Sequence, residues 1–198
     1  MAVCAILVTI PNTVNTVRGR PVMMMKADES TLVLIDLQKK LMPVISHGNL
    51  MLAESVRLAQ IAKLLDVPVI ATEQIPEKLG HNDEQIRALA DQTLSKTHFD
   101  ACGGGLVEAI ADNRKQVVIG GCEAHVCLLQ TALSLLAAGF RVWVVENATG
   151  SRHDNDRDAA LERMQQAGAV IVTLEMVAFE WMRDCEHPRF REVQKLIK

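Results

Sequence analysis

The sequence predicts an α/β fold: a three-layer sandwich with helices on both faces of a six-stranded, mainly parallel sheet of strand order 3-2-1-4-5-6. Six short apolar runs alternate with segments of helical length and periodicity, and turn residues separate them. A chain of 198 residues is long enough to bury one core without metal or disulfide staples. We therefore expect one α/β domain with right-handed crossovers.

The first strand has the clearest signal. Residues 31–35 are a continuous apolar and β-branched run that ends at Asp36, which is typical of a strand buried on both faces. The elements expected next are a helix over 49–66, a strand over 67–72 that ends at Glu73, a turn-rich stretch over 75–82, a strand over 93–96 and a helix over 106–113.

The central unit runs from residue 117 to 138 and contains a strand, a tight turn and a helix. The strand covers 117–121, and the helix covers 127–138 and is closed by Gly139. The remaining elements expected are a strand over 141–146, a helix over 155–167, a strand over 169–173, and short helices over 174–183 and 190–197.

Composition argues against several classes of partner. The formal charge of −3 and the absence of tyrosine give no electrostatic or stacking surface for nucleic acid, and no basic surface for an anionic membrane. The five cysteines are odd in number and irregularly spaced, which indicates neither a disulfide framework nor a metal knuckle. We expect reduced thiols and a cytoplasmic location.

Residues 1–26 differ from the rest and are predicted to be a non-catalytic N-terminal extension. Their apolar run over 2–10 is too short to span a bilayer. Arg18, Arg20 and Lys26 occur without an acidic residue, which weakly resembles a transit peptide and leaves a mitochondrial location as an alternative. The favoured interpretation is that the methionines at 23–25 mark the start of the functional chain.

Three side chains with complementary chemistry lie at the predicted carboxyl ends of strands, the edge where such sheets bind ligands. Asp36 follows the first strand, Lys96 the third, and Cys127 lies past the fourth at a helix start that favours an anion. Taken one at a time, each residue has a non-catalytic interpretation: Asp36 as a helix N-cap or an acid in a solvated loop, Lys96 as a surface lysine, and Cys127 as a small thiol in the core. Together they supply a base, an ammonium and a nucleophile for attack on an acyl carbon, with backbone N–H groups over 121–127 for the oxyanion.

The same segments resemble a known family. The resemblance rests on Leu34-Ile-Asp36-Leu-Gln38, on Lys96-Thr-His-Phe99, and on Gly120-Gly-Cys-Glu-Ala-His-Val-Cys127 with the helix after it. The chain is similar to the isochorismatase-like cysteine hydrolases, and is most similar to the isochorismatase domain-containing subgroup. The resemblance implies a Rossmann-like hydrolase domain over residues 27–198.

The resemblance also implies roles for residues. It makes Cys127 the nucleophile, Asp36 the base and Lys96 the third member of a catalytic triad. It implies a cis peptide between Cys122 and Glu123, and an oxyanion hole formed by the backbone N–H groups of Glu123 and Cys127. The residues we expect near the substrate are Gln38, Glu73, Phe99 and His125.

Departures from the family patterns narrow the expected chemistry. Glu73 and His81 are the only plausible metal ligands near the second strand, so we expect no metal, and nicotinamide is a poor substrate candidate. True isochorismatases do not need a cysteine at position 127, so Cys127 favours acyl chemistry. We expect a small amide or related carbonyl compound to be hydrolysed through a thioester, without an organic cofactor.

Two alternatives remain open at this point. The chain can be a non-catalytic oligomeric binding protein that keeps the fold, or a redox protein that forms a Cys122–Cys127 disulfide. Apolar residues near the C-terminus, Met176, Phe179, Trp181 and Met182, suggest a subunit interface, although the same residues would also fit a cap over the sheet. We expect a homo-oligomer, a dimer or larger.

Overall fold

The sheet has the predicted number and order of strands. The computed structural model describes residues 16–17, 20–21 and 23–198. Six strands are hydrogen-bonded in the order β5-β4-β3-β6-β7-β8, which is the expected order 3-2-1-4-5-6, and every neighbouring pair is parallel. The strands are β3 (Ser30–Ile35), β4 (Val69–Gln74), β5 (Gln92–Lys96), β6 (Gln116–Gly121), β7 (Arg141–Thr149) and β8 (Val170–Val172).

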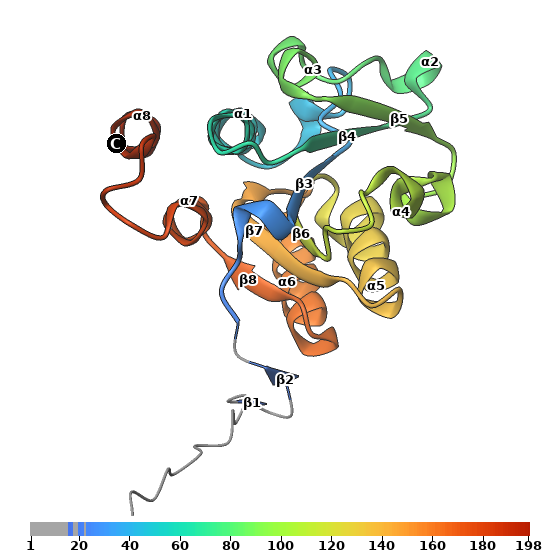
Figure 1. Cartoon of the computed structure of the whole chain (residues 1–198). Coiled ribbons are helices and arrows are strands. Elements are labelled where there is room, and N and C mark those ends of the chain that lie inside the picture. Colours follow the sequence, from blue (N-terminus) through green and yellow to red (C-terminus); the bar gives the residue numbers. More distant parts are fainter. Residues whose placement is uncertain (1–15, 18–19, 22) are drawn as a thin grey trace, which may run out of the picture.

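Helices cover both faces of this sheet, as the sequence predicts. One face carries α1 (Gly48–Leu64), α7 (Leu174–Met182) and α8 (Phe190–Ile197), and the other carries α4 (Leu106–Ala109), α5 (Leu129–Ala137) and α6 (Asp154–Ala167) (Figure 1). Alternate residues of β3 divide between the two cores, because successive strand side chains point to opposite faces. Leu32 and Leu34 pack under α1, whereas Val33 and Ile35 pack under α5.

A close contact between the two central strands requires glycine at one position. Gly121 ends β6 with φ of 121°, in the region that L side chains rarely adopt. A Cβ atom there would lie 2.1 Å from the carbonyl oxygen of Ile35. The turn that leaves β6 therefore lies directly beside the end of β3.

Several boundaries differ from the sequence expectation. Strand β4 continues through Gln74 and β7 continues to Thr149, because both are paired with a neighbouring strand over these residues. The stretch expected to be turns contains the short α2 (Pro76–Leu79), and it is followed by α3 (Glu84–Leu89), which the periodicity did not predict. The helix after β6 begins earlier, as a π-helical turn over Ala124–Leu128.

The edge around β8 joins the start of the domain to α7. Met25 is fully buried, and its backbone N–H donates to Glu180 Oε2 at 2.6 Å. Trp181 and Met182, which the sequence suggested for a subunit interface, are buried in this chain's own core, so that part of the suggestion was wrong. The apolar run over 2–10 lies outside the described residues.

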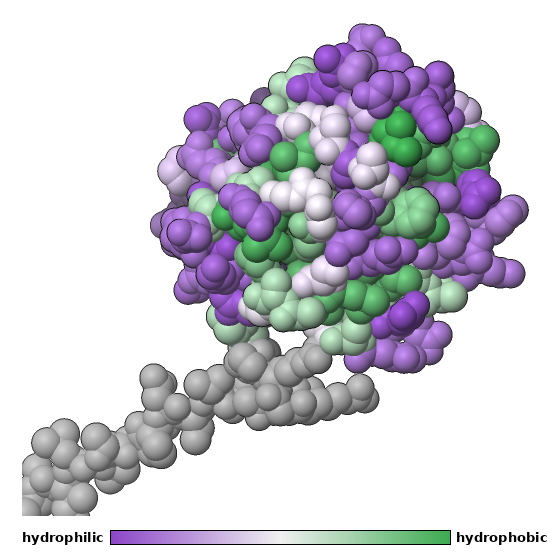
Figure 2. Space-filling model, turned by 90° about the vertical axis from the view of Figure 1, so that its right-hand side faces the viewer, coloured by the Kyte–Doolittle hydropathy of each residue, from purple (hydrophilic) through white to green (hydrophobic). Residues whose placement is uncertain are grey.

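The surface is mixed. On the face shown in Figure 2, hydrophilic residues surround smaller hydrophobic areas. Among the described residues, no helix has the length and apolar character needed to cross a bilayer.

Candidate active site

Asp36 lies at the carboxyl edge of the sheet, one residue after β3, and is fully buried. Its φ of 50° turns the chain out of the strand. Thr72 on β4 holds it twice: the Thr72 hydroxyl donates to Asp36 Oδ1 at 2.7 Å, and the Asp36 N–H donates to the Thr72 carbonyl at 3.2 Å. One carboxylate oxygen is therefore fixed by a neutral donor.

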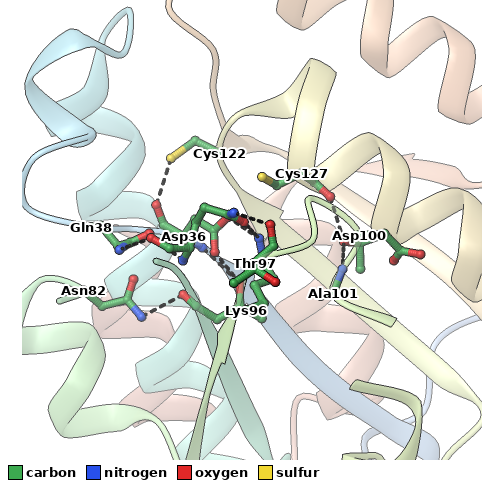
Figure 3. A network of polar contacts seen from close by, with 12 residues as sticks. Asp36, Gln38, Asn82, Lys96, Thr97, Asp100, Ala101, Cys122 and Cys127 are labelled. Carbon is green, nitrogen blue, oxygen red and sulfur yellow. Dashed lines mark hydrogen bonds and ion pairs between the residues drawn. The ribbon is translucent and has the colours of Figure 1, made fainter. Parts of the chain in front are cut away.

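Lys96 brings the balancing charge from the end of β5. Its Nζ lies 2.7 Å from Asp36 Oδ2 (Figure 3). The same Nζ lies 2.7 Å from Gln74 Oε1. The side chains of Lys96 and Asp36 are 1% and 0% exposed. Burying both charges is costly unless they are paired and hydrogen-bonded, and here they are both.

Cys127 lies beside this ion pair on the π-helical turn and is 7% exposed. Burial, and after it the Asp36 charge, raise the pKa of its thiol, the Lys96 charge lowers it, and the net result is a pKa of about 12. The bias toward thiolate expected from a helix start is outweighed by this burial. Cys127 is therefore a neutral thiol in the resting protein, and the Asp36 carboxylate lies close enough to accept its proton.

The turn between β6 and α5 holds the other groups of interest. The peptide bond between Cys122 and Glu123 is cis. Within the described part of the chain, the backbone N–H of Glu123 donates to no protein acceptor. The Cys122 thiol is fully buried and donates to the Asp36 carbonyl, with Sγ 3.2 Å from the oxygen. Cys122 and Cys127 are both free thiols, and both lie above the ion pair in Figure 3.

The loop after β5 is tied to α5 beside the cysteine. The Ala101 N–H donates to the Thr131 hydroxyl, which itself donates to the Cys127 carbonyl at 2.7 Å. Asp100 accepts from the Ser134 hydroxyl at 2.7 Å. These bonds hold the segment that follows Lys96 against the turn that carries Cys127.

A comparison with known protein families matches residues 30–176 to the isochorismatase domain. The chain belongs to the isochorismatase family. Mouse isochorismatase domain-containing protein 2A is 40% identical over 174 residues, which is 86% of this chain and 84% of the mouse protein. Zebrafish isochorismatase domain-containing protein 1 is 38% identical, but the match covers 82% of this chain and only 59% of that protein.

Solved structures show the same isochorismatase fold. The MAR1 ribonuclease from Caenorhabditis elegans is 35% identical, with a TM-score of 0.84 over 88% of this chain and 92% of that chain. The YcaC gene product of Escherichia coli is described as an octameric hydrolase of unknown specificity. It is 25% identical, with a TM-score of 0.80 over 89% of this chain and 97% of that chain.

Two residues expected near the substrate of this isochorismatase-family chain are held by contacts within the protein. Gln38 is fully buried, and its amide bonds to the main chain of Gln74. Glu73 accepts from the Asn82 N–H at 2.8 Å and lies 3.0 Å from His81 Nδ1. No group of three or more His, Cys, Asp or Glu side chains is arranged to hold a metal ion in the parts of the chain that the structure describes.

The other two expected residues have solvent-accessible side chains. His125 lies on the π-helical turn, with Nδ1 3.0 Å from the Ser151 hydroxyl and Nε2 3.9 Å from Asp156. Phe99, in the loop after β5, is 53% exposed. Both are therefore free to contact a bound molecule, His125 through the part of its ring left uncovered.

Sequence reasoning missed Thr72 and Gln74, which hold Asp36 and Lys96. The signal was present in the alternation along β4, since residues 72 and 74 share a face and Glu73 points to the other. The apolar pattern predicts a strand over 67–72 that ends at Glu73, which leaves residue 74 outside the strand.

Proposed function

We propose that this chain is a cysteine-dependent hydrolase of a small amide or related carbonyl compound that works through a thioester. The observation that carries the proposal is the fully buried Asp36–Lys96 ion pair beside the Cys127 thiol at the carboxyl edge of the sheet. Membership of the isochorismatase family supports hydrolase chemistry in general. The combination of a thiol, a carboxylate and an ammonium group favours one kind of hydrolase reaction, nucleophilic acyl transfer.

In the proposed reaction, Asp36 takes the thiol proton as Cys127 Sγ attacks the carbonyl carbon. The resulting oxyanion accepts hydrogen bonds from the backbone N–H groups of Glu123 and Cys127. The C–N bond then breaks, and the protonated Asp36 gives its proton to the leaving amine. Water, deprotonated by Asp36, attacks the thioester and releases the carboxylic acid, and the proton returns to the thiol.

Lys96 has an electrostatic role in this scheme. A thiol with a pKa of about 12 is almost entirely protonated at neutral pH, so its proton must leave as the new bond forms. The Lys96 ammonium lowers the cost of the negative charge that passes between sulfur and carboxylate. The reaction needs no organic cofactor and no metal.

Cys127→Ala tests the assignment because it removes the nucleophile with a small change in volume. We expect loss of hydrolysis across a panel of small amides, and loss of the thioester that hydroxylamine traps, with an unchanged melting temperature. Cys102→Ala, which removes a half-buried thiol outside the proposed site, is the matched control and should stay active. Normal turnover by Cys127→Ala would overturn the proposal. Because a structural relative is called a ribonuclease, the panel also includes an RNA oligonucleotide, and its cleavage in a Cys127-dependent reaction would likewise overturn the proposal.

We also propose that the chain forms a homo-oligomer. Met176 and Phe179 are 46% and 45% exposed and line one hollow together with Met24, and a solved relative is octameric. Phe179→Asp should lower the molar mass measured by light scattering after gel filtration. Val44→Asp, at a residue that is 54% exposed elsewhere on the surface, should leave the mass unchanged. A monomeric parent protein would contradict the proposal.

For the N-terminal segment we propose a non-catalytic role and for the whole protein a cytoplasmic location. All the polar groups assigned a role in the reaction lie after residue 35. Deletion of residues 1–22, which keeps the buried Met25, should leave hydrolysis unchanged.

The cytoplasmic location is tested separately. Imaging of the full chain with a C-terminal fluorescent tag would distinguish a cytoplasmic from a mitochondrial location.

A further inference from the structure

Gln74 is the last residue of β4 and has an amide side chain that is buried between two partners. Its Nε2 donates to the Thr97 carbonyl at 2.8 Å, and its Oε1 accepts from Lys96 Nζ at 2.7 Å. Since only the NH₂ end of an amide can donate to a carbonyl, the bond to Thr97 fixes which end faces the lysine. The oxygen is therefore held toward the ammonium.

The main chain of Gln74 is fixed as well. Gln38 Oε1 accepts from the Gln74 N–H at 2.8 Å, and Gln38 Nε2 donates to the Gln74 carbonyl at 3.0 Å. This fully buried side-chain amide bonds to both main-chain groups of the residue, as a neighbouring strand does. Backbone and side chain of Gln74 are thus both restrained before Lys96 is considered.

These restraints determine where the Lys96 ammonium points. The ammonium carries three hydrogens, of which Asp36 and Gln74 take two. The third is left for the thiol or a reacting group. An amide oxygen also accepts this hydrogen bond without adding a negative charge beside the lysine, which a second carboxylate would do.

We propose that Gln74 is a positioning residue that keeps the Lys96 ammonium directed at the reacting sulfur of Cys127. The proposal rests on the hydrolase function proposed above and adds to it a residue that acts only through Lys96. The titratable groups that face Cys127 are Asp36 from β3, Lys96 from β5, and the Cys122 thiol from the turn after β6. Gln74 alters the balance among these groups without itself titrating.

The test measures the rate of Cys127 alkylation by iodoacetamide from pH 6 to pH 10, with the modified peptide identified by mass spectrometry. This readout needs no knowledge of the substrate. Gln74→Met removes the acceptor at similar volume, and Gln74→Glu keeps the shape but adds a negative charge beside Lys96. Both changes should move the profile to higher pH, so that alkylation at a fixed pH falls roughly tenfold for every pH unit that the profile moves.

The chain offers a matched control in Gln116, another buried glutamine at the opposite end of the sheet. Its Oε1 accepts from the Lys26 N–H at 2.8 Å, and its Nε2 donates to Glu29. Gln116→Met should lower the melting temperature and leave the alkylation profile of Cys127 in place. A structural role of buried glutamines in general would instead leave the profile unchanged in every variant.

The outcomes separate this proposal from the hydrolase function. Alkylation profiles of both Gln74 variants that coincide with the parent profile would overturn the positioning role, even if amides are hydrolysed. Amide hydrolysis by Cys127→Ala would overturn the proposed function, whatever the Gln74 variants do. If Gln74→Met fails to fold, the near-isosteric Gln74→Glu decides the matter alone, because movement of the profile to higher pH is expected from it as well.

Discussion

The two ends of the sheet both bury polar groups, but they bury different kinds. At the carboxyl end, Asp36 and Lys96 bury full charges. At the amino end, the buried groups are neutral: the indole of Trp181 donates to the Ser30 hydroxyl at 3.0 Å, and Gln116 accepts from a backbone N–H. The charged groups of that end, among them Glu29, remain partly exposed to solvent.

This difference distinguishes buried polar groups that only stabilise the fold from buried polar groups suited to a reaction. A neutral network needs only partners for its donors and acceptors, and it then contributes a modest net stability. A buried ion pair carries a desolvation cost that an apolar pair of the same volume would avoid. Stability alone therefore does not explain why Asp36 and Lys96 are buried, whereas the proposed reaction, which moves a proton and a negative charge, would explain it.

The largest expected effect on stability comes from removing one partner of the buried Asp36–Lys96 ion pair. Lys96→Met leaves the Asp36 carboxylate buried without its cation and should lower the free energy of unfolding by about 3–5 kcal/mol. The double variant Asp36→Asn/Lys96→Met should recover part of this loss while remaining inactive. Urea denaturation measures both. A single variant no less stable than Gln116→Met would remove the contrast between the two ends.

A smaller effect is expected at the neutral end. Ser30→Ala leaves the buried Trp181 N–H without its acceptor and should lower the free energy of unfolding by about 1–3 kcal/mol. The alkylation rate of Cys127 should stay at the parent value, since the serine lies at the opposite end of β3. Ser95→Ala, at an exposed serine, is the control and should change stability by less than about 0.5 kcal/mol. Slower alkylation in Ser30→Ala would show that the ends are coupled.

The smallest effect is a dependence of stability on pH. Burial raises the pKa of the Cys127 thiol from its ordinary value of 9.0 to about 12. The folded state thus holds this proton more tightly than the unfolded state, so its contribution is complete below pH 9 and is lost as pH rises from 9 toward 12. Between pH 9 and 10, unfolding measurements should show a decline of about 1 kcal/mol that Cys127→Ala reduces and that Cys185→Ala, at an exposed thiol, does not. A decline of equal slope in all three proteins would assign the effect to other groups.

Much of the fold can be predicted from the pattern of single segments of the sequence. The apolar run before Asp36 predicted a strand buried on both faces, and β3 is buried throughout. The order of the strands and the covering of both faces were confirmed as well. Periodicity failed where elements are short: α3 spans Glu84–Leu89, and too few of its positions repeat for a helical pattern to stand out.

The site was legible only in part. The sequence predicts that Asp36, Lys96 and Cys127 lie together, because their residue types suggest complementary chemistry and because parallel strands end at a common edge, and the structure places the three side chains side by side. The contacts of Gln38, Glu73 and Gln74 were not foreseen, since they depend on where β4 stops pairing with β5. A difference of two residues in the strand end decides which side chains face the ion pair.

The amino-acid sequence is sufficient to predict the layers of this protein and the residues that carry charge and sulfur to one edge of the sheet, because hydrophobic periodicity and strand ends are local properties of the chain. The depth at which Cys127 is buried, the amide that holds Lys96 and the place of Trp181 in the core are seen only in the folded chain. Those features depend on register and on packing between distant segments, and the balance of burial against neighbouring charge that sets a pKa exists only once these segments have met.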